Sequence, residues 1–177
     1  MQRVPMAEFE PGLKKRLEEL WGEPVNLYRA LGNHPKLAAA WTEFANAIRH
    51  DSRTPRKLRE IMILRTAQLA RSHYEWAQHL KMARKAGVSE NQINELELWR
   101  ESKHFDARER AALALTEGVM AGNVTDEIYH RAAQHFDHAE YVELCLTAAF
   151  YAMVSRMLDA MRVEFDDDIR EHAPRLP

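Results

Sequence analysis

RSHYEWAQH, residues 71–79, lies near the middle of this 177-residue chain and brings together an acid, two imidazoles, a phenol and a hydroxyl. If the stretch is helical, Ser72, Glu75 and His79 occupy positions i, i+3 and i+7 and share one face. Glu75 and His79 are then close enough to exchange a proton. A carboxylate beside an imidazole is a common way to tune a general acid or base towards neutral pH. The stretch therefore predicts a helix that presents acid/base chemistry on one face.

The same residues also have a purely structural interpretation. Ser72 and Glu75 have the spacing of a capping box, with Ser72 as the N-cap and Glu75 three positions into the helix. His79 would then be an ordinary buried histidine, and structural pairs also perturb pKa values. From the spacing alone the structural interpretation is the stronger of the two. The two are compatible, because a capped helix can still direct side chains into a pocket.

Composition narrows the class of protein. Apolar residues make up 46% and charged residues 29% of the chain, which is usual for a single globular domain. The net charge of −2 gives no reason to expect a nucleic acid or an anionic membrane as partner. The N-terminal residues lack the apolar core of a signal peptide, and the single cysteine, Cys145, cannot form an internal disulfide. We therefore expect a cytoplasmic protein.

The turn and cap signals predict helices throughout, because no run of alternating β-branched residues is bounded by turn residues. Thr54 and Pro55 are expected at the N-cap and first position of a helix that ends at the Ser72 break. Further caps are predicted at Ser89, Asp106 and Thr125, and Gly87 is expected to end the helix before Ser89. The expected helices cover residues 11–20, 25–31, 35–50, 55–71, 73–86, 90 onward, 107 to about 120, 126–136 and 139–163.

Two of these helices, over residues 58–70 and 142–158, are apolar on nearly all sides. The second contains Glu143 and Arg156, so it is not expected to span a membrane. In a chain of this length, two such helices favour a homo-oligomer over a monomer with a central helix hairpin. The first helix also carries Glu60 and Arg65, and buried charges are normally paired.

Glu60 and the 71–79 stretch together resemble a known signature. In the alkylhydroperoxidase D-like superfamily, a Glu is followed eleven residues later by Cys-x-His-Cys, and then after three residues by a His. Here Glu60 is followed after eleven residues by Ser-His-Tyr-Glu at 72–75 and by His79. The carboxymuconolactone decarboxylase branch of that superfamily is similar in further segments, which are LREI at 58–61, YEWAQH at 74–79, ARKAGVS at 83–89 and YAMVSR at 151–156.

The resemblance runs from about residue 35 to residue 166. It implies an all-α, alkylhydroperoxidase D-like helical fold with one carboxymuconolactone decarboxylase-like domain over residues 35–166. Residues 1–34 would be an N-terminal helical extension and residues 167–177 a C-terminal tail. The family also implies a homo-oligomer, a trimer or hexamer, with a dimer possible.

The departures from the signature concern its reactive positions. Ser72 and Glu75 stand at the two cysteine positions, and Tyr74 stands where the redox branch has its inner histidine. A thiol peroxidase needs one thiolate to attack the peroxide and a second thiol to resolve it. Neither Ser72 nor Glu75 can do this, so an alkylhydroperoxidase D-type peroxidase is disfavoured.

The decarboxylase branch implies a cofactor-independent acid/base lyase or isomerase of a small carboxylated organic molecule, with no metal and no organic cofactor. His79 and Glu75 would form the acid/base pair, with Glu60 converging on the same cavity. Arg71 or Arg65 would hold a carboxylate, Tyr74 would donate to an enolate oxygen, and Ser72 would line the pocket. The alternative is a non-catalytic or stress-associated family member. His130, His135 and His138 lie close together near Glu140, but they do not make a closed metal-ligand set.

Overall fold

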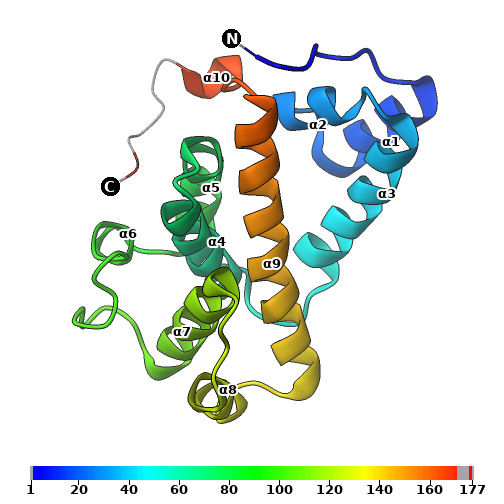
Figure 1. Ribbon diagram of the computed structural model, residues 1–177. Helices are drawn as coiled ribbons and strands as arrows, with labels where there is room; N and C mark the ends of the chain where they lie inside the picture. Colours follow the sequence, from blue (N-terminus) through cyan, green and yellow to red (C-terminus); the bar gives the residue numbers. More distant parts are fainter. Residues whose placement is uncertain (1, 171–175, 177) are drawn as a thin grey trace. The chain divides into compact units, whose positions relative to one another are not determined.

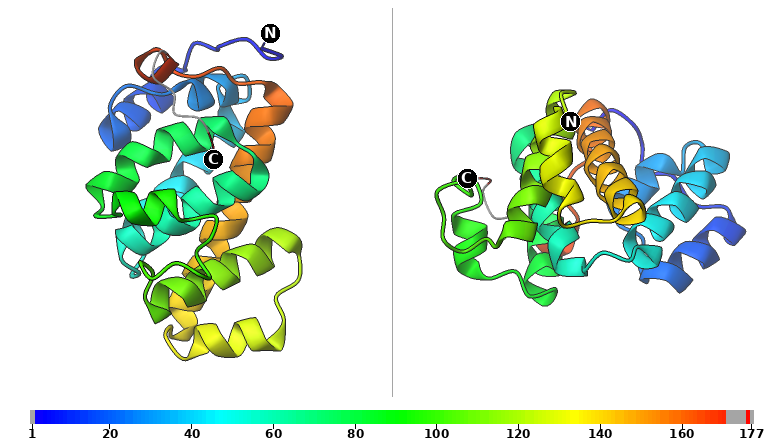
Figure 2. Two further views of the ribbon diagram at one scale, coloured as in Figure 1. Left: turned by 90° about the vertical axis from the view of Figure 1, so that its left-hand side faces the viewer. Right: turned by 90° about the horizontal axis from the view of Figure 1, so that it is seen from below.

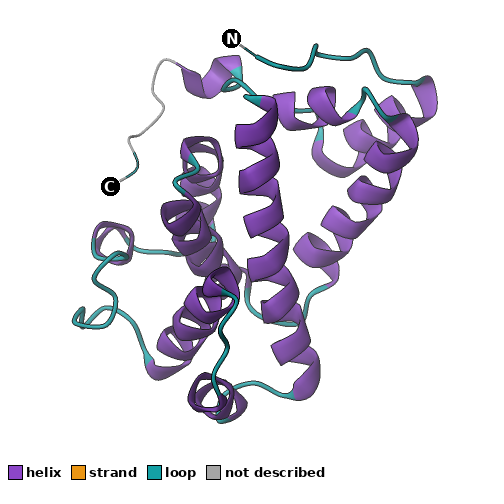
Figure 3. Cartoon of the chain, in the orientation of Figure 1, coloured by secondary structure: helices purple, strands orange, loops and turns teal. Residues whose placement is uncertain are grey.

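The computed structural model describes residues 2–170 and 176, and its regular elements there are all helices (Figures 1 and 3). The predicted all-α class is confirmed. The elements are α1 (Pro11–Trp21), α2 (Asn26–Leu31), α3 (Pro35–Asn46), the π-helical turn η1 (Ala47–Asp51), α4 (Arg56–Ala70), α5 (His73–Lys85), α6 (Glu90–Asn94), α7 (Ala107–Ala121), α8 (Asp126–Ala133), α9 (His138–Met161) and α10 (Asp167–Arg170).

Contacts divide the chain into two compact units, and each is described by itself. Among the described residues, the first contains residues 2–51 and 157–170, and the second contains residues 52–156 and 176. The division expected from the motifs, at residues 35 and 166, concerns family resemblance rather than contacts and remains a prediction. Of the expected tail, residues 167–170 form α10, residue 176 is described, and the rest lies outside the described residues.

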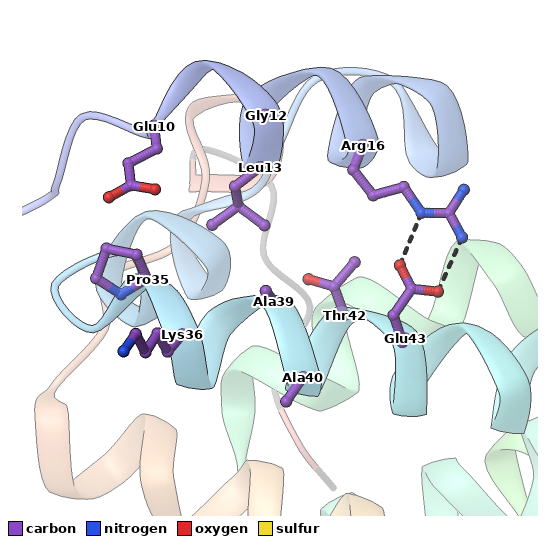
Figure 4. A pocket seen from close by; sticks show the side chains of 10 residues that line it. All are labelled: Glu10, Gly12, Leu13, Arg16, Pro35, Lys36, Ala39, Ala40, Thr42 and Glu43. Carbon is purple, nitrogen blue, oxygen red and sulfur yellow. Dashed lines mark hydrogen bonds and ion pairs between the residues drawn. The ribbon is translucent and has the colours of Figure 1, made fainter.

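The first unit contains a groove between α1 and α3 (Figure 4). Its volume is about 540 Å³. Arg16 on α1 donates two hydrogen bonds to Glu43 on α3, at 2.7 and 2.8 Å, and the two side chains join the helices at one end of the groove. The residues that line the groove do not include any of the predicted site residues.

The second unit is built around α4, whose residues 58–67 are all buried. On one side Ile61 and Leu64 belong to a core cluster with Trp76 and Leu80 of α5 and with Leu113 of α7. On the other side, further α4 side chains pack in a second cluster with α7, α8 and α9. Burying each large aliphatic side chain contributes about 1.5–3 kcal/mol. A polar side chain on α4 is therefore held in a fixed, dry environment.

The start of α4 differs from the expectation in one detail. Pro55, not Thr54, is the N-cap, and no side chain caps the helix there. Thr54 has other partners, because its N–H donates to Glu143 Oε2 at 3.0 Å and its carbonyl accepts from the Arg59 guanidinium. The prediction of Thr54 as the cap was wrong because these contacts come from residues that the local pattern does not include.

The long helix α9 carries an exposed apolar face. By length and composition it is the one helix of the described residues that could cross a membrane, but half of its apolar window is buried, and core helices pass the same test. Val142, Leu146 and Met153 are 54%, 41% and 39% exposed and follow one another at helical spacing. The homo-oligomer expected from the sequence remains a proposal, with this face as the surface that a second copy would cover.

Candidate functional site

Three helices of the second unit supply the side chains around His79. The helices α4 and α5 form a hairpin and lie side by side in every view (Figures 1 and 2). Glu60 projects from α4, Glu75 and His79 project from α5, and Tyr151 reaches the same place from α9. The predicted convergence of Glu60, Glu75 and His79 is thus present in the structure.

Glu60 and His79 form a buried hydrogen bond. Glu60 is 0% and His79 is 2% exposed, and His79 Nδ1 lies 2.8 Å from Glu60 Oε2. An ionised carboxylate can only accept, so Nδ1 carries the proton in this bond. In the neutral imidazole Nε2 is then the unprotonated nitrogen. Glu60 therefore selects the tautomer and the orientation of the His79 ring.

The second ring nitrogen of His79 faces Glu75. Glu75 is 4% exposed, and its Oε2 lies 3.6 Å from His79 Nε2. This distance is slightly too long for a formed hydrogen bond, but a small side-chain movement would close it. The His79 imidazole thus lies between the carboxyl groups of Glu60 and Glu75. We call this set the Glu60–His79–Glu75 relay.

The junction between α4 and α5 explains why the Glu75 carboxylate is directed towards His79. Arg71 adopts a left-handed conformation with φ 53°, and the Ser72 N–H donates to the carbonyl of Ala67 at 2.9 Å. Ser72 Oγ accepts from the Glu75 N–H at 3.4 Å, so Ser72 is the predicted N-cap. The reciprocal half of the capping box is absent here, because the Ser72 N–H already has a partner. Glu75 is therefore not needed as a cap.

Two neighbours, His79 and Arg56, stabilise the negative charge of the Glu60 carboxylate. Burial by itself would raise the pKa of the Glu60 carboxyl, but His79 and the Arg56 guanidinium outweigh burial and hold the pKa below its ordinary value of 4.5. Arg56 lies four residues before Glu60 on α4, and its guanidinium forms a close ion pair with Glu60 Oε1. Glu60 is therefore ionised at neutral pH.

Tyr151 and Arg59 complete the surroundings of the relay. The ring of Tyr151 meets the His79 ring edge to face, with centroids 4.9 Å apart, and Tyr151 is 1% exposed. Burial lowers the pKa of the Arg59 guanidinium, and the neighbouring Arg56 lowers it further. Glu143, Tyr151 and Glu60 act in the opposite direction. Arg59 is buried and donates to Thr54. Two guanidinium groups thus accompany the Glu60 end of the relay.

Residues 35–118 match the model of the carboxymuconolactone decarboxylase family. Over this segment, which is 84 of the 177 residues, the chain is similar to the carboxymuconolactone decarboxylase family. The matched segment contains Glu60, Glu75 and His79. No curated protein matches the sequence.

Solved structures show the same alkylhydroperoxidase D-like fold. A peroxidase-related protein of Ralstonia eutropha JMP134, described as an alkylhydroperoxidase AhpD core, is 17% identical with a TM-score of 0.82, and the match covers 99% of this chain and 97% of that one. The debrominase Bmp8 is 19% identical with a TM-score of 0.79, over 94% and 92% of the two chains. A protein of unknown function from Agrobacterium tumefaciens is 23% identical with a TM-score of 0.70, over 76% and 93%.

The residues that we predicted to bind substrate lie in different parts of the second unit. Arg65 is 9% exposed and donates to Glu117 at 2.7 and 2.9 Å and to Gln68 at 2.8 Å, so its guanidinium is engaged away from the relay. Arg71 is exposed at the α4–α5 junction. Tyr74 is buried, and its hydroxyl accepts from Gln78 Nε2 at 3.5 Å.

Two residues beside the relay were not predicted from the sequence. Arg56 had a usable signal, because residues four apart on a helix are neighbours and Glu60 had already been singled out. Tyr151 lay in the YAMVSR segment that carried the family resemblance, but its contact with His79 depends on how α9 packs against α5. The phenol that touches the imidazole is thus Tyr151. The role expected for Tyr74, as a hydrogen-bond donor to an enolate oxygen, stays a prediction.

The remaining candidates do not form a second site. No group of three or more His, Cys, Asp or Glu side chains in residues 2–170 and 176 is placed to hold a metal ion, so the structure lends no support to one at His130, His135 and His138. Cys145 is half-buried, and burial raises the pKa of its thiol although a hydrogen bond with Tyr141 acts the other way. A raised pKa disfavours the thiolate that redox chemistry needs.

Proposed function

We propose that this protein is a cofactor-independent acid/base lyase or isomerase of a small carboxylated organic molecule. The observation that carries the proposal is the buried Glu60–His79–Glu75 relay, in which an ionised carboxylate fixes one imidazole nitrogen and leaves the other for a second carboxyl group. The Ser-His-Asp triad uses the same logic, with a buried acid that orients a histidine towards the reacting group. Here Glu75 stands in the reacting position.

The charges indicate how the relay would move a proton. Arg56 pairs with Glu60, and in the proposed mechanism one proton would pass between His79 Nε2 and Glu75 Oε2, which lie 3.6 Å apart. In a decarboxylation, the bond between the substrate carbon and its carboxylate breaks and CO2 leaves, while the electron pair stays on the carbon as an enolate. The exchangeable proton is then delivered to that carbon, and solvent restores it. In an isomerisation the same group takes a proton from one carbon and returns it to another.

The similarity to a debrominase supports a small cyclic substrate. A cysteine-to-alanine variant of Bmp8 is 19% identical to this chain with a TM-score of 0.76 over 91% of this chain and 87% of that one, and it forms a complex with 2,3,4-tribromopyrrole. A fold of this kind can therefore take up a small ring. The family description points to carboxylated lactones as the first compounds to test.

Burial favours the second candidate, a non-catalytic family member. Glu60, His79 and Glu75 are at most 4% exposed, so a substrate must displace a side chain before it reaches them. A buried set of charges can also be a purely structural device. The thiol peroxidase stays the least favoured function, because Ser72 and Glu75 occupy the positions of the signature thiols and Cys145 is the only cysteine.

Turnover assays separate these three functions. We expect the protein to release CO2 from carboxymuconolactone, or to isomerise a related carboxylated lactone, at a rate that a metal chelator does not change. With tert-butyl hydroperoxide and dithiothreitol, peroxide loss should not exceed that of the Cys145→Ser variant. Peroxide turnover that depends on Cys145 would contradict the proposal. So would the absence of lactone turnover across a panel of such lactones.

A further inference from the structure

Arg56 is the most accessible of the charged groups that contact the relay. Its side chain is 32% exposed, whereas that of its partner Glu60 is 0% exposed. A terminal nitrogen of the guanidinium contacts Glu60 Oε1 and lies 3.8 Å from the sulfur of Met82, which is itself 39% exposed. Arg56 therefore lies between the buried carboxylate and the surface of the protein.

The two cations near Glu60 differ in how deeply they are buried. Arg59 is 4% exposed and its guanidinium is tied to the backbone and hydroxyl of Thr54. Arg56 has a long, partly hydrated side chain, and arginine can replace one carboxylate by another with the same bidentate geometry. Glu60 would not be left alone by such an exchange, because His79 continues to donate to its other oxygen.

We propose that Arg56 receives the carboxylate of the substrate by leaving Glu60, and that this exchange both opens the relay and prepares it for proton transfer. The inference rests on the proposed function, because it assigns a substrate group to that site. It replaces Arg71 and Arg65, the cations expected from the sequence, by one that contacts the relay directly. Arg56 would be a positioning residue for the chemistry at Glu75 and His79.

The electrostatic consequence of the exchange has a definite sign. Arg56 is one of the two groups that hold the Glu60 pKa down. When it turns to a substrate carboxylate, the full negative charge of Glu60 acts on His79, and the substrate adds a further negative charge nearby. The His79 ring is also faced by Glu75 on α5 and Tyr151 on α9. Arg59 on α4 lies near Glu60 and offsets only part of the added negative charge. Binding of an anion at Arg56 therefore makes the electrostatic potential at the His79 ring more negative.

Binding of a simple carboxylate tests the exchange without requiring turnover. We would titrate benzoate, with neutral benzamide as the matched probe, and follow the ring resonances of His79 by NMR at pH 7. In the wild type, benzoate should shift these resonances in a saturable manner, and benzamide should not. Arg56→Gln should weaken the apparent benzoate affinity by about tenfold or more, the effect of losing a charged hydrogen bond.

Two variants keep the test interpretable. Arg84→Gln is the matched control, since Arg84 also pairs with a glutamate, Glu90, but is exposed on another part of α5; it should leave the response unchanged. Arg56→Lys keeps the charge, so it covers the case in which Arg56→Gln does not fold, and it should bind benzoate several-fold more weakly than the wild type. An unchanged response in a folded Arg56 variant, or no benzoate response in the wild type, would overturn the inference.

The outcomes of these experiments distinguish a failure of the Arg56 inference from a failure of the proposed function. A benzoate response that depends on Arg56, in a protein without lactone turnover, would refute the catalytic proposal and keep the anion site. Lactone turnover that an Arg56 variant retains, with an unchanged KM, would refute the role of Arg56 and keep the catalytic proposal.

Discussion

Replacing His79 with Ala is expected to lower turnover of a carboxylated lactone by about 10²- to 10⁴-fold, the usual contribution of a positioned general acid or base. The imidazole links Glu60 and Glu75, since its two nitrogens face the two carboxyl groups at 2.8 and 3.6 Å. Without it, Glu75 loses the group with which it shares a proton. Glu60 keeps Arg56 as a partner, so the variant should still fold.

The control for this variant is a second histidine on the same helix. His73 is the first residue of α5 and is exposed. His73→Ala should leave the rate unchanged, and circular dichroism should give the same helix content for both variants and the wild type. A folded His79→Ala protein that keeps the wild-type rate would rule out any role of the relay in catalysis.

Replacing Glu60 with Gln is expected to destabilise the protein by about 3 kcal/mol at pH 7, the order expected when a buried charged pair is broken. Glu60 is fully buried, and the change removes the charge that both Arg56 and His79 contact. The pKa of Glu60 lies below 4.5 in the folded protein, because His79 and Arg56 outweigh the opposing effect of burial. The stabilisation by the ionised form is therefore complete above about pH 4.5 and is lost as the pH falls through the lower, folded-state value.

Chemical denaturation at several pH values measures this difference. The stability gap between wild type and Glu60→Gln should be constant between pH 5 and 7 and should shrink below pH 4.5. Glu90→Gln is the matched control, because Glu90 pairs with Arg84 on the surface, and exposed pairs contribute little. A gap that grows on acidification would mean that Glu60 is held protonated in the folded state.

Local sequence patterns predicted the helix boundaries well where both halves of a cap come from neighbouring residues. The capping boxes at Ser89–Gln92 and Asp106–Glu109 are both complete in the structure. At Ser72 the pattern was equally clear, but only half of the box forms. The missing half depends on the left-handed turn at Arg71, which directs the Ser72 N–H to Ala67. Residues other than glycine seldom adopt that conformation, so the residue type at position 71 does not predict it.

The residues of the candidate site likewise fall into those that local spacing predicts and those that depend on tertiary packing. Helical periodicity placed Glu75 and His79 on one face, and a hairpin of two helices brought Glu60 to them. The contacts of Arg65 were beyond this reasoning, because its partner Glu117 lies 52 residues further along the chain. Tyr151 comes from a third helix and meets His79 only through tertiary packing. Spacing along a helix therefore predicted the relay, whereas the residues around it required the packed structure.

The central claim is that Glu75 takes part in proton transfer rather than in capping α5. The direct test compares turnover and the melting temperature of the Glu75→Gln variant with those of the wild type. Glutamine keeps the shape of the side chain and could complete a capping box, but it cannot exchange a proton with His79. The relay predicts a loss of turnover of about 10²-fold or more with a melting temperature within a few degrees of the wild type. Wild-type turnover in Glu75→Gln would contradict the account.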